Sequence, residues 1–365
     1  MSEKTRTDIL REEVVIPKVV RQKADAAFEM ILAESGAGKA IRLRQRRRKR
    51  YAAAAAVAAL LLSTVTAGAA YLKWSRGLER DLAVTEEQKG KAQSTCLAGF
   101  PNLSVEDKGI VVTAQQSIVD NNYGYLAFKV EGFEKGKGKE PGFESLSIRV
   151  DGREDISYTY GMYDGDEEKV NEDGSFEYLI MLYGDKEKGS FKDKKIDVEF
   201  SGLGVVTEKA GSARDVIEGK WAFSWQLTGS DEIYTAKVSE KLGDTGALVT
   251  GAEVSPISIK AVYDFPAKMV KEEAVDESSG TVYETDMLAE PPLLAGVKLK
   301  DGTLVTDTQG GRMGYTDGGK KVYEECFAMG RILDVDEVES LLFIKKIPEE
   351  EKNLGENDMF VVKIR

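Results

Sequence analysis

The chain of 365 residues has no histidine, only two cysteines and only eight prolines. Without histidine it lacks the usual general base, the common zinc ligand and the partner that activates a serine or cysteine nucleophile. Its 63 Asp and Glu residues would allow a two-carboxylate hydrolase, but no spacing singles out a pair. We therefore expect a protein that is not an enzyme and that binds no cofactor.

The most acidic stretch does not fit a calcium site. Residues 164–174 read DGDEEKVNEDG, and an EF-hand loop beginning at Asp164 would need glycine at its sixth position and glutamate at its twelfth. Those positions are occupied by Lys169 and Ser175. We expect a solvated hairpin loop here and no metal site.

A basic stretch near the N-terminus, SGAGKAIRLRQRRRKR (35–50), allows two functional interpretations. A phosphate-binding loop is excluded, because Ala33 stands where that motif needs its first glycine and Ala40 where it needs a hydroxyl. A nucleic-acid patch is the second interpretation, since seven of the nine residues 42–50 are basic. The residues that follow favour a different role, in membrane topology.

Residues 51–72, YAAAAAVAALLLSTVTAGAAYL, contain no charge and no proline. At about 1.5 Å per residue they would form a helix long enough for a hydrocarbon core of about 30 Å. We therefore predict one transmembrane helix. A buried helix of a soluble protein and a cleaved signal peptide are the alternatives, although fifty residues precede this apolar run and a signal peptide has a short n-region.

The flanking residues orient the predicted span. Lys and Arg remain on the cytoplasmic side, and aromatic rings favour the headgroup layers. The N-terminus is then cytoplasmic and the C-terminus extracellular. Residues 75–365 carry a net charge of −20, from −12 for the chain and +8 for residues 1–74, so bulk charge gives no nucleic-acid binding. The expected topology residues are Arg46, Arg47, Arg48, Lys49, Arg50, Tyr51 and Trp74.

The cytoplasmic segment is too short to bury a core of its own. Between Pro17 and Gly36, which suit a helix start and stop, apolar residues recur at helical spacing on one face. Such a helix docks in a groove of another protein or lies on the inner leaflet. Its polar face mixes both signs of charge, which favours a protein partner. The expected contact residues are Val19, Val20, Ala24, Ala27, Phe28, Ile31 and Leu32.

The outer region alternates apolar and polar residues between Gly, Asp and Asn clusters. We predict a mainly β fold: a short cytoplasmic helix, one transmembrane helix, then two antiparallel β-sandwich-like (Ig-like) extracytoplasmic domains. Broken alternation near Gly202 predicts a bulge. The expected divisions are 1–50 (cytoplasmic segment), 51–72 (transmembrane helix), 73–99 (juxtamembrane stalk), 100–229 (first sandwich) and 230–365 (second sandwich).

Two segments of the outer region are similar to each other. DKGIVVTAQQSI (107–118) and DTGALVTGAEVS (244–255) share the pattern D-x-G-x-x-V-T. This pattern favours two copies of one sandwich, although a hairpin-rich sequence also produces such matches by chance. Cys96 and Cys326 both lie outside the predicted membrane, where a disulfide between them is permitted and two free thiols are equally compatible.

The order of several motifs resembles that of single-pass anti-sigma factors of Gram-positive bacteria. An I-P-x-x-V segment (16–20) opens the first helix, and a basic run, one span and a β-rich region follow. Three outer segments are similar to the domains of unknown function attached to that family: GKWAFSWQL (219–227), VSPISIKAVYDF (254–265) and ILDVDEVESLLF (332–343).

The resemblance implies that the inner helix binds an extracytoplasmic-function sigma factor and keeps it from RNA polymerase. It also implies release by an outside signal and a site-specific protease. Many members carry a zinc-binding His-Cys-Cys module, which a histidine-free chain cannot form, so only the non-zinc type fits. The alternative is a membrane-anchored cell-surface binding or envelope-structural module with no transcriptional role.

Overall fold

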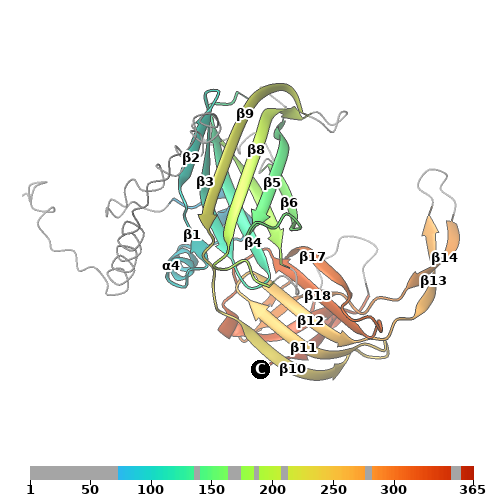
Figure 1. The fold of residues 1–365 in the computed structure, drawn as a ribbon. Coiled ribbons are helices and arrows are strands. Elements are labelled where there is room, and N and C mark those ends of the chain that lie inside the picture. The colour runs from blue at the N-terminus through green and yellow to red at the C-terminus, as the bar shows by residue number, and fades with distance from the viewer. Residues whose placement is uncertain are drawn as a thin grey trace, which may run out of the picture. The chain divides into compact units, whose positions relative to one another are not determined.

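The computed structural model describes residues 73–134, 140–162, 174–184, 189–206, 213–275, 282–346 and 355–365. The predicted cytoplasmic segment and the predicted span lie outside the described residues, as does the acidic stretch 164–173. In the part of the chain that is described, no helix is both long and apolar enough to cross a membrane. That part belongs to one compact unit and is mainly β, as predicted, with several antiparallel sheets (Figure 1).

In the described part of the chain two short helices come first, and two sets of strands follow, which we call the first repeat (residues 98–226) and the second repeat (residues 234–363). The helices are α3 (Arg76–Asp81) and α4 (Glu86–Ser94). The strands of the first repeat are β1 (Ala98–Gly99), β2 (Leu103–Asp107), β3 (Ile110–Val119), β4 (Tyr123–Glu131), β5 (Glu140–Val150), β6 (Ser157–Met162), β7 (Phe176–Tyr183), β8 (Lys195–Val206) and β9 (Ala213–Gln226).

The second repeat contains the remaining elements. Its strands are β10 (Tyr234–Lys241), β11 (Leu248–Ser255), β12 (Ser258–Asp264), β13 (Met269–Val275), β14 (Val282–Leu288), β15 (Leu294–Leu299), β16 (Leu304–Val305), β17 (Thr308–Tyr315), β18 (Val322–Met329), β19 (Val338–Ile344) and β20 (Met359–Lys363). Two 3-10 helices, η3 (Val335–Glu337) and η4 (Glu356–Asp358), precede β19 and β20.

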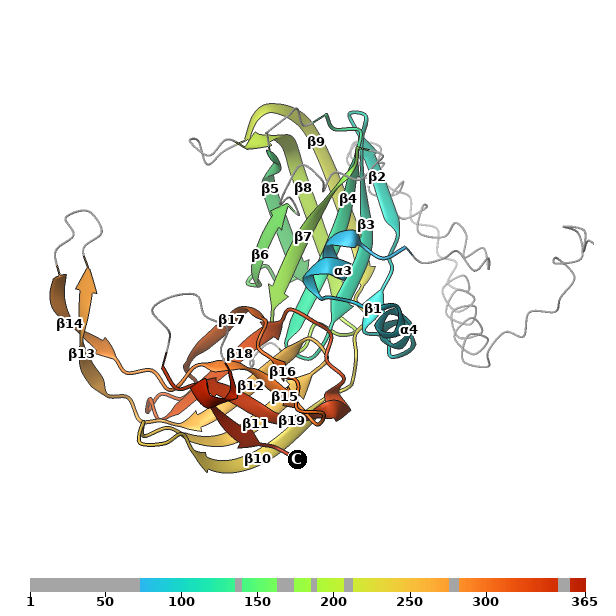
Figure 2. The ribbon, with the colours of Figure 1, turned by 180° about the vertical axis from the view of Figure 1, so that it is seen from behind.

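Both repeats share a common strand order, to which the second repeat adds β16 and the two-stranded sheet β13-β14 (Figures 1 and 2). The larger sheet runs β1-β3-β4-β7-β6 in the first repeat, with β2 beside β3, and β10-β11-β12-β18-β17 in the second. The smaller sheet runs β5-β8-β9 in the first repeat and β16-β15-β19-β20 in the second. The similarity between residues 107–118 and 244–255 therefore marks the same hairpin in two copies of one topology.

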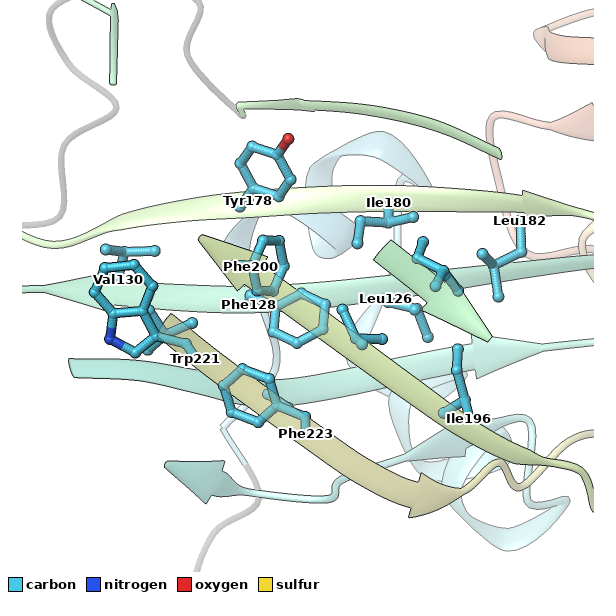
Figure 3. Close-up of a cluster of buried hydrophobic side chains, with 14 of the residues drawn as sticks. Leu126, Phe128, Val130, Tyr178, Ile180, Leu182, Ile196, Phe200, Trp221 and Phe223 are labelled. Atoms are coloured by element: carbon cyan, nitrogen blue, oxygen red, sulfur yellow. The ribbon is translucent and has the colours of Figure 1, made fainter. Parts of the chain in front are cut away.

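An aromatic cluster fills the space between the two sheets of the first repeat. Phe128 from the larger sheet meets Phe200 from the smaller one edge to face, with ring centroids 4.9 Å apart (Figure 3). The indole N–H of Trp221, on β9, donates to the carbonyl of Ile110, on β3, at 3.0 Å. This bond gives the indole of a fully buried tryptophan a polar partner. Burial of these rings is the main source of stability for the repeat.

The second repeat has a separate core with fewer phenylalanines and more aliphatic side chains. Tyr263 on β12 lies across from Phe343 on β19, with centroids 5.9 Å apart. Val338 and Leu341, also on β19, are fully buried beside them. Each repeat therefore encloses a hydrophobic core between its own pair of sheets.

Bulges change which face a side chain occupies in both repeats. The β3–β4 register shifts between Ala114 and Gln116, and the β11–β12 register shifts between Val249 and Gly251. A bulge reverses the alternation of faces, so residues beyond it that would point to the core point outward instead. The bulge predicted near Gly202 is confirmed: the β8–β9 register shifts there, and Gly202 has a φ of 58°.

Candidate functional site

The candidate site is the segment that directly follows the predicted span, residues 73–99, together with the surfaces that contact it. We call residues 73–99 the anchored segment. The partner-binding residues expected from sequence lie outside the described residues: Val19, Val20, Ala24, Ala27, Phe28, Ile31 and Leu32. The same is true of the topology residues Arg46, Arg47, Arg48, Lys49, Arg50 and Tyr51, whereas Trp74, Cys96 and Cys326 are described.

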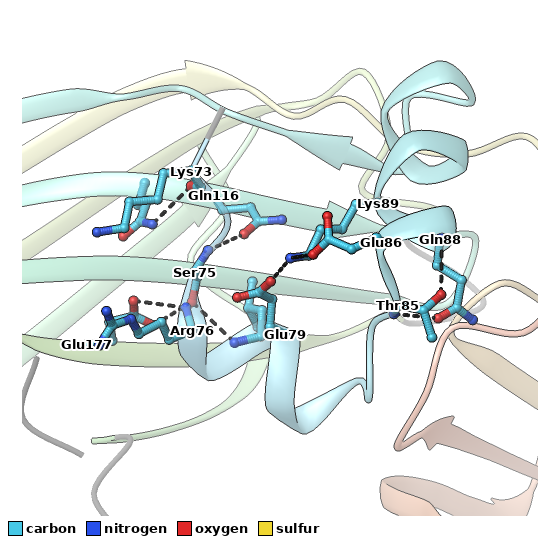
Figure 4. A network of polar contacts seen from close by, with 12 residues as sticks. Lys73, Ser75, Arg76, Glu79, Thr85, Glu86, Gln88, Lys89, Gln116 and Glu177 are labelled. Atoms are coloured by element: carbon cyan, nitrogen blue, oxygen red, sulfur yellow. Dashed lines mark hydrogen bonds and ion pairs between the residues drawn. The ribbon is translucent and has the colours of Figure 1, made fainter. Parts of the chain in front are cut away.

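One carboxylate fixes the start of the anchored segment. Glu177, buried on the outer face of β7, accepts hydrogen bonds from the Ser75 hydroxyl at 2.5 Å and the Gly77 N–H at 2.8 Å (Figure 4). A third donor, the Arg76 N–H, lies 3.1 Å away. The first N–H groups of a helix have no partner within it and favour negative charge. Glu177 therefore attaches α3 to the first repeat.

Two adjacent glutamines of β3 bind the backbone just before α3. The Oε1 of Gln116 accepts from the Ser75 N–H at 2.8 Å, and the Nε2 of Gln115 donates to the Lys73 carbonyl at 3.1 Å. Both residues lie at the β3 bulge, and Gln116 is placed on the outer face of the sheet by the reversed alternation. The main chain is thus bound from its first described residue onward.

The apolar residues of the anchored segment belong to a core shared by both repeats. Trp74, Leu78 and Leu82 are buried with side chains from β3 and β4 of the first repeat and β18 of the second. The backbone carbonyl of Leu82 also accepts from the Ile332 N–H at 3.3 Å. The full cluster contains Trp74, Leu78, Leu82, Ala92, Leu97, Ala98, Ile118, Tyr123, Tyr125, Ala127, Ile257, Cys326, Ala328 and Ile332.

These contacts correct two expectations. We predicted residues 73–99 to be a polar juxtamembrane stalk, but they form two short helices packed on the sheets, because Leu78 and Leu82 are buried completely. We expected Trp74 to lie in the headgroup layer, but its side chain is only 4% exposed and packs edge-on against Phe100 at 6.0 Å. A protein core, not a lipid interface, surrounds this ring.

Helix α4 bridges to the second repeat. Thr85 and Gln88 form a capping box, in which each side chain bonds the other residue's N–H (Figure 4). The Nε2 of Gln88 also donates to the Ile332 carbonyl at 2.7 Å. Lys91 lies 3.0 Å from Asp334, an exposed pair that adds little stability. Lys89 pairs with Glu79 and so ties α4 back to α3.

The two repeats meet through the tips of their matching hairpins. Asp120, at the β3–β4 tip, is fully buried and accepts from the N–H groups of Asn122 and Tyr123 at 2.8 and 2.9 Å. Its other oxygen accepts from the Ile257 N–H at 3.1 Å and the Ser258 hydroxyl at 2.7 Å, both at the β11–β12 tip. Burial raises the pKa of Asp120, while these four hydrogen bonds favour its ionised form.

A second carboxylate extends the contact between the tips. Glu253 on β11 accepts from the amide groups of Asn121 and Asn122, each at 2.9 Å, and pairs with Lys260 at 2.6 Å. Burial alone would raise the pKa of Glu253, but Lys260 and the two amides outweigh it and lower the pKa. The two carboxylates of this junction are therefore surrounded by hydrogen-bond donors beside the shared apolar core, which favours one fixed arrangement.

Neither cysteine is in a disulfide. Cys96 is exposed and Cys326 is buried, and both are free thiols. The permitted Cys96–Cys326 bridge is thus not formed. Burial raises the pKa of the Cys326 thiol to about 12, so this residue is a packing side chain and not a reactive nucleophile. Its carbonyl accepts from the Tyr123 hydroxyl at 2.7 Å, which adds another bond between the repeats.

A polar cavity of about 210 Å³ lies beside the start of the anchored segment. Lys73, Arg76 and Lys129 line it together with Glu131 and Glu177. Glu177 is occupied by α3, and Glu131 pairs with Lys129 at 2.8 Å. The described residues contain no group of three or more His, Cys, Asp or Glu that could hold a metal ion. Chemically, the site binds a segment of its own chain.

Sequence reasoning missed Glu177, Gln116 and Asp120. Their partners are distant in sequence, and a lone Glu in FEYLIMLY (176–183) or Asp in an NNYG turn looks like an ordinary surface residue. One local signal was present: T-x-x-Q at residues 85–88 is a capping-box pattern that predicts the start of α4.

Comparisons with known proteins give little more. A scan against protein-family models finds no match, and a search of curated proteins finds none. Among solved structures, one match is described as the crystal structure of the conserved domain protein from Bacillus anthracis. The two chains are 16% identical with a TM-score of 0.39, over 73% of this chain and 86% of that one. A likeness this low carries no argument about function.

Proposed function

We propose that this chain is a membrane-anchored anti-sigma factor of the non-zinc type, single-pass, with its N-terminus cytoplasmic and its C-terminus extracellular. Its inner helix sequesters an extracytoplasmic-function sigma factor, and its β-rich outer region responds to an extracellular signal. The observation that carries the proposal is the order of segments: an amphipathic helix too short to fold alone, a basic run, 22 uncharged and largely apolar residues and an acidic β-rich body.

The anchored segment supports a specific role for the outer region. Proteases cleave chains that are extended and accessible, and protection follows from burial and hydrogen bonding of the backbone. Residues 74–82 are held by Glu177, by Gln116 and by the shared core. We infer that the two repeats shield the chain just outside the membrane, and that a signal would act by loosening this contact so that a site-specific protease gains access.

We also propose that each repeat is an immunoglobulin-like sandwich. The support is its two-layer arrangement of antiparallel sheets around one core, with about 130 residues per copy, in the usual range for a domain. A sandwich of this kind can present binding surfaces and requires neither cofactor nor metal to do so.

The test of the regulatory proposal is capture of the sigma factor from detergent-solubilised membranes. Phe28→Asp and Ile31→Asp place a charge on the face expected to be buried, and each costs several kcal/mol of binding (about 2–7 kcal/mol for an unpaired buried polar group). We expect both variants to lose the sigma factor. Lys23→Asp, on the polar face of the same helix, is the matched control and retains it.

Deleting residues 1–36 separates this proposal from the alternative of an envelope module. An anti-sigma factor without these residues would raise transcription of the genes that its sigma factor controls. Full sigma-factor capture by both Asp variants would contradict the proposed contact face of the helix. An unchanged transcriptome, with no sigma factor captured by the wild-type chain, would leave only the envelope-module interpretation.

A further inference from the structure

Strand β6 is an unusual edge. It ends its sheet in the order β1-β3-β4-β7-β6, so no described strand pairs with its other side. Edge strands are normally protected from foreign strands by charges, prolines or short length. Among the described edge strands longer than two residues, β6 (SYTYGM) is the one with neither a charge nor a proline. Among the described residues, its outer backbone N–H and C=O groups are therefore available as a template for a further strand.

A groove runs along the same edge on the outer face of the sheet. It measures about 190 Å³ and is lined by Thr159 and Gly161 of β6, Leu179 and Met181 of β7, and Asp81 and Gln309. Helix α3 contacts β4 and β7 but leaves β6 uncovered (Figure 2). A Cβ atom at Gly161 would meet nothing within 4 Å, so the groove is open above that residue.

The floor of the groove is rigid. The Tyr125 hydroxyl donates to the Oε1 of Gln309 at 3.0 Å, and the Nε2 of Gln309 donates to the Asp81 carbonyl at 2.9 Å. On the same strand, the Tyr160 side chain is 57% exposed and its ring stacks on Tyr178, with centroids 5.8 Å apart. A fixed, exposed aromatic ring beside an open edge is a typical receptor for a cationic side chain.

Backbone geometry and charge indicate which kind of ligand would bind at the β6 edge. An open sheet edge with a groove beside it recognises an extended polypeptide, whose main chain pairs with the edge while alternate side chains point to either face. Residues 75–365 carry a net charge of −20, so a basic segment is attracted. A second copy of this chain brings the same negative charge and is repelled.

We propose that β6 and its groove form a docking site for an extended, positively charged segment of a partner protein, which adds to the sheet as a further strand. One set of its side chains lies over Leu179 and Met181 near Asp81, and the other set lies beside Tyr160. This site depends neither on the inner helix nor on the membrane assignment. Its test is therefore separate from the test of the regulatory proposal.

The test uses the full-length chain in detergent and a fluorescein-labelled peptide of sequence KVKVKVK. We expect saturable binding, read by fluorescence anisotropy, and slower amide hydrogen exchange in residues 157–162. The same peptide methylated at every backbone nitrogen cannot donate to a sheet edge and does not bind. An EVEVEVE peptide tests charge and also fails to bind.

Two variants locate the site, and one variant controls for charge. Thr159→Lys places a charge on the edge, and Gly161→Phe places a ring over the groove from a Cβ position that meets nothing within 4 Å. Each weakens KVKVKVK binding by about tenfold, the effect of losing one or two hydrogen bonds or an equivalent contact. Ser104→Lys adds the same charge to the edge strand β2 and leaves binding unchanged. Thermal unfolding of all three shows that they are folded.

Three results would overturn the proposal. The first is no saturable binding of KVKVKVK to the wild-type chain. The second is equal binding by the N-methylated peptide or by folded Thr159→Lys and Gly161→Phe. The third is a wild-type dimer in sedimentation that Thr159→Lys dissociates, because a second copy of the chain would then occupy the edge.

Discussion

The two repeats have the same strand order, yet each uses a buried glutamate of the matching strand in a different way. Glu177 lies on β7 and faces outward, where three donors of the anchored segment surround it. Glu325 lies on β18 and faces the core, where the Tyr263 hydroxyl donates to it at 2.6 Å and the Leu294 N–H at 2.8 Å. Burial raises the pKa of Glu325 to about 7.

The difference shows how one topology has been adapted to two tasks. In the first repeat the outer face of the larger sheet has become a receptor for α3, and a carboxylate there gains from free helix N–H groups. In the second repeat a carboxylate inside the core has fewer donors and is costly to ionise. The matching strand therefore contributes to recognition in one copy and to pH sensitivity in the other, from different positions and opposite faces.

The largest expected effect tests whether the repeats unfold separately. Trp221→Ala removes the largest side chain of the first core and lowers the free energy of unfolding by about 3–5 kcal/mol. Because the shared core joins both repeats, we expect one urea transition, followed by circular dichroism, in which both copies unfold together. Tyr283→Ala, at an exposed position of β14, is the control and changes stability by less than about 0.5 kcal/mol.

The reverse outcome would be informative about the junction. Two resolved transitions in Trp221→Ala would mean that Asp120 and the shared apolar cluster do not couple the repeats. The anchored segment would then unfold together with the first repeat alone.

The next effect is the pH dependence due to Glu325. The pKa of Glu325 is about 7 in the folded state, against the ordinary value of 4.5 for the unfolded chain. Between these two pH values the folded state therefore binds a proton that the unfolded state has lost. The stabilisation is complete below about pH 4.5 and is lost as pH rises through about 7, for a total of about 3 kcal/mol. Glu325→Gln stays neutral and flattens this slope in urea unfolding at pH 5 and pH 8.

The matched variant is Glu177→Gln, which keeps the slope because Glu325 is intact. A slope that persists in Glu325→Gln would assign the pH dependence to other groups, such as Asp120, whose pKa burial also raises.

The smallest and most local effect concerns the anchored segment. Glu177→Gln replaces a carboxylate that accepts three hydrogen bonds by an amide that donates on one side, and costs about 1–3 kcal/mol. Trypsin should then cut after Arg76 and Arg80 faster than in the wild type, as read by mass spectrometry. Glu199→Gln on β8 is the control and leaves these cleavage rates unchanged. Equal rates in all three proteins would show that Glu177 does not secure α3.

Local sequence predicts the strands well and the site poorly. Alternation identifies β7, in which Phe176, Tyr178, Ile180 and Leu182 all face the core, and the D-x-G-x-x-V-T pattern falls on the matching hairpin of both repeats. The anchored segment could not be found this way, because its helices are short, largely charged and of very low amphipathicity in α4. Their order comes from contacts more than a hundred residues away, such as Ser75 with Glu177, which no local pattern encodes.

Trp74 is an instructive case. An aromatic residue just beyond an apolar run fits a headgroup position in any local interpretation. Its burial against Phe100 depends on the β3 bulge, which presents Gln116 and Ile118 to the anchored segment. That bulge lies forty residues further along the chain, and nothing in the sequence near Trp74 reports it.

The shared core also sets an order of assembly. Leu82 contacts the Ile332 N–H, and the cluster around it includes Cys326 and Ala328 from β18. A chain synthesised from its N-terminus makes α3 early, yet the cover for α3 is complete only when residues 326–334 have emerged. A copy truncated before β18 would lack the part of the cover over Leu82 that residues 326–334 supply. The solvent exposure of the α3 region therefore depends on whether the C-terminal part of the chain has been synthesised.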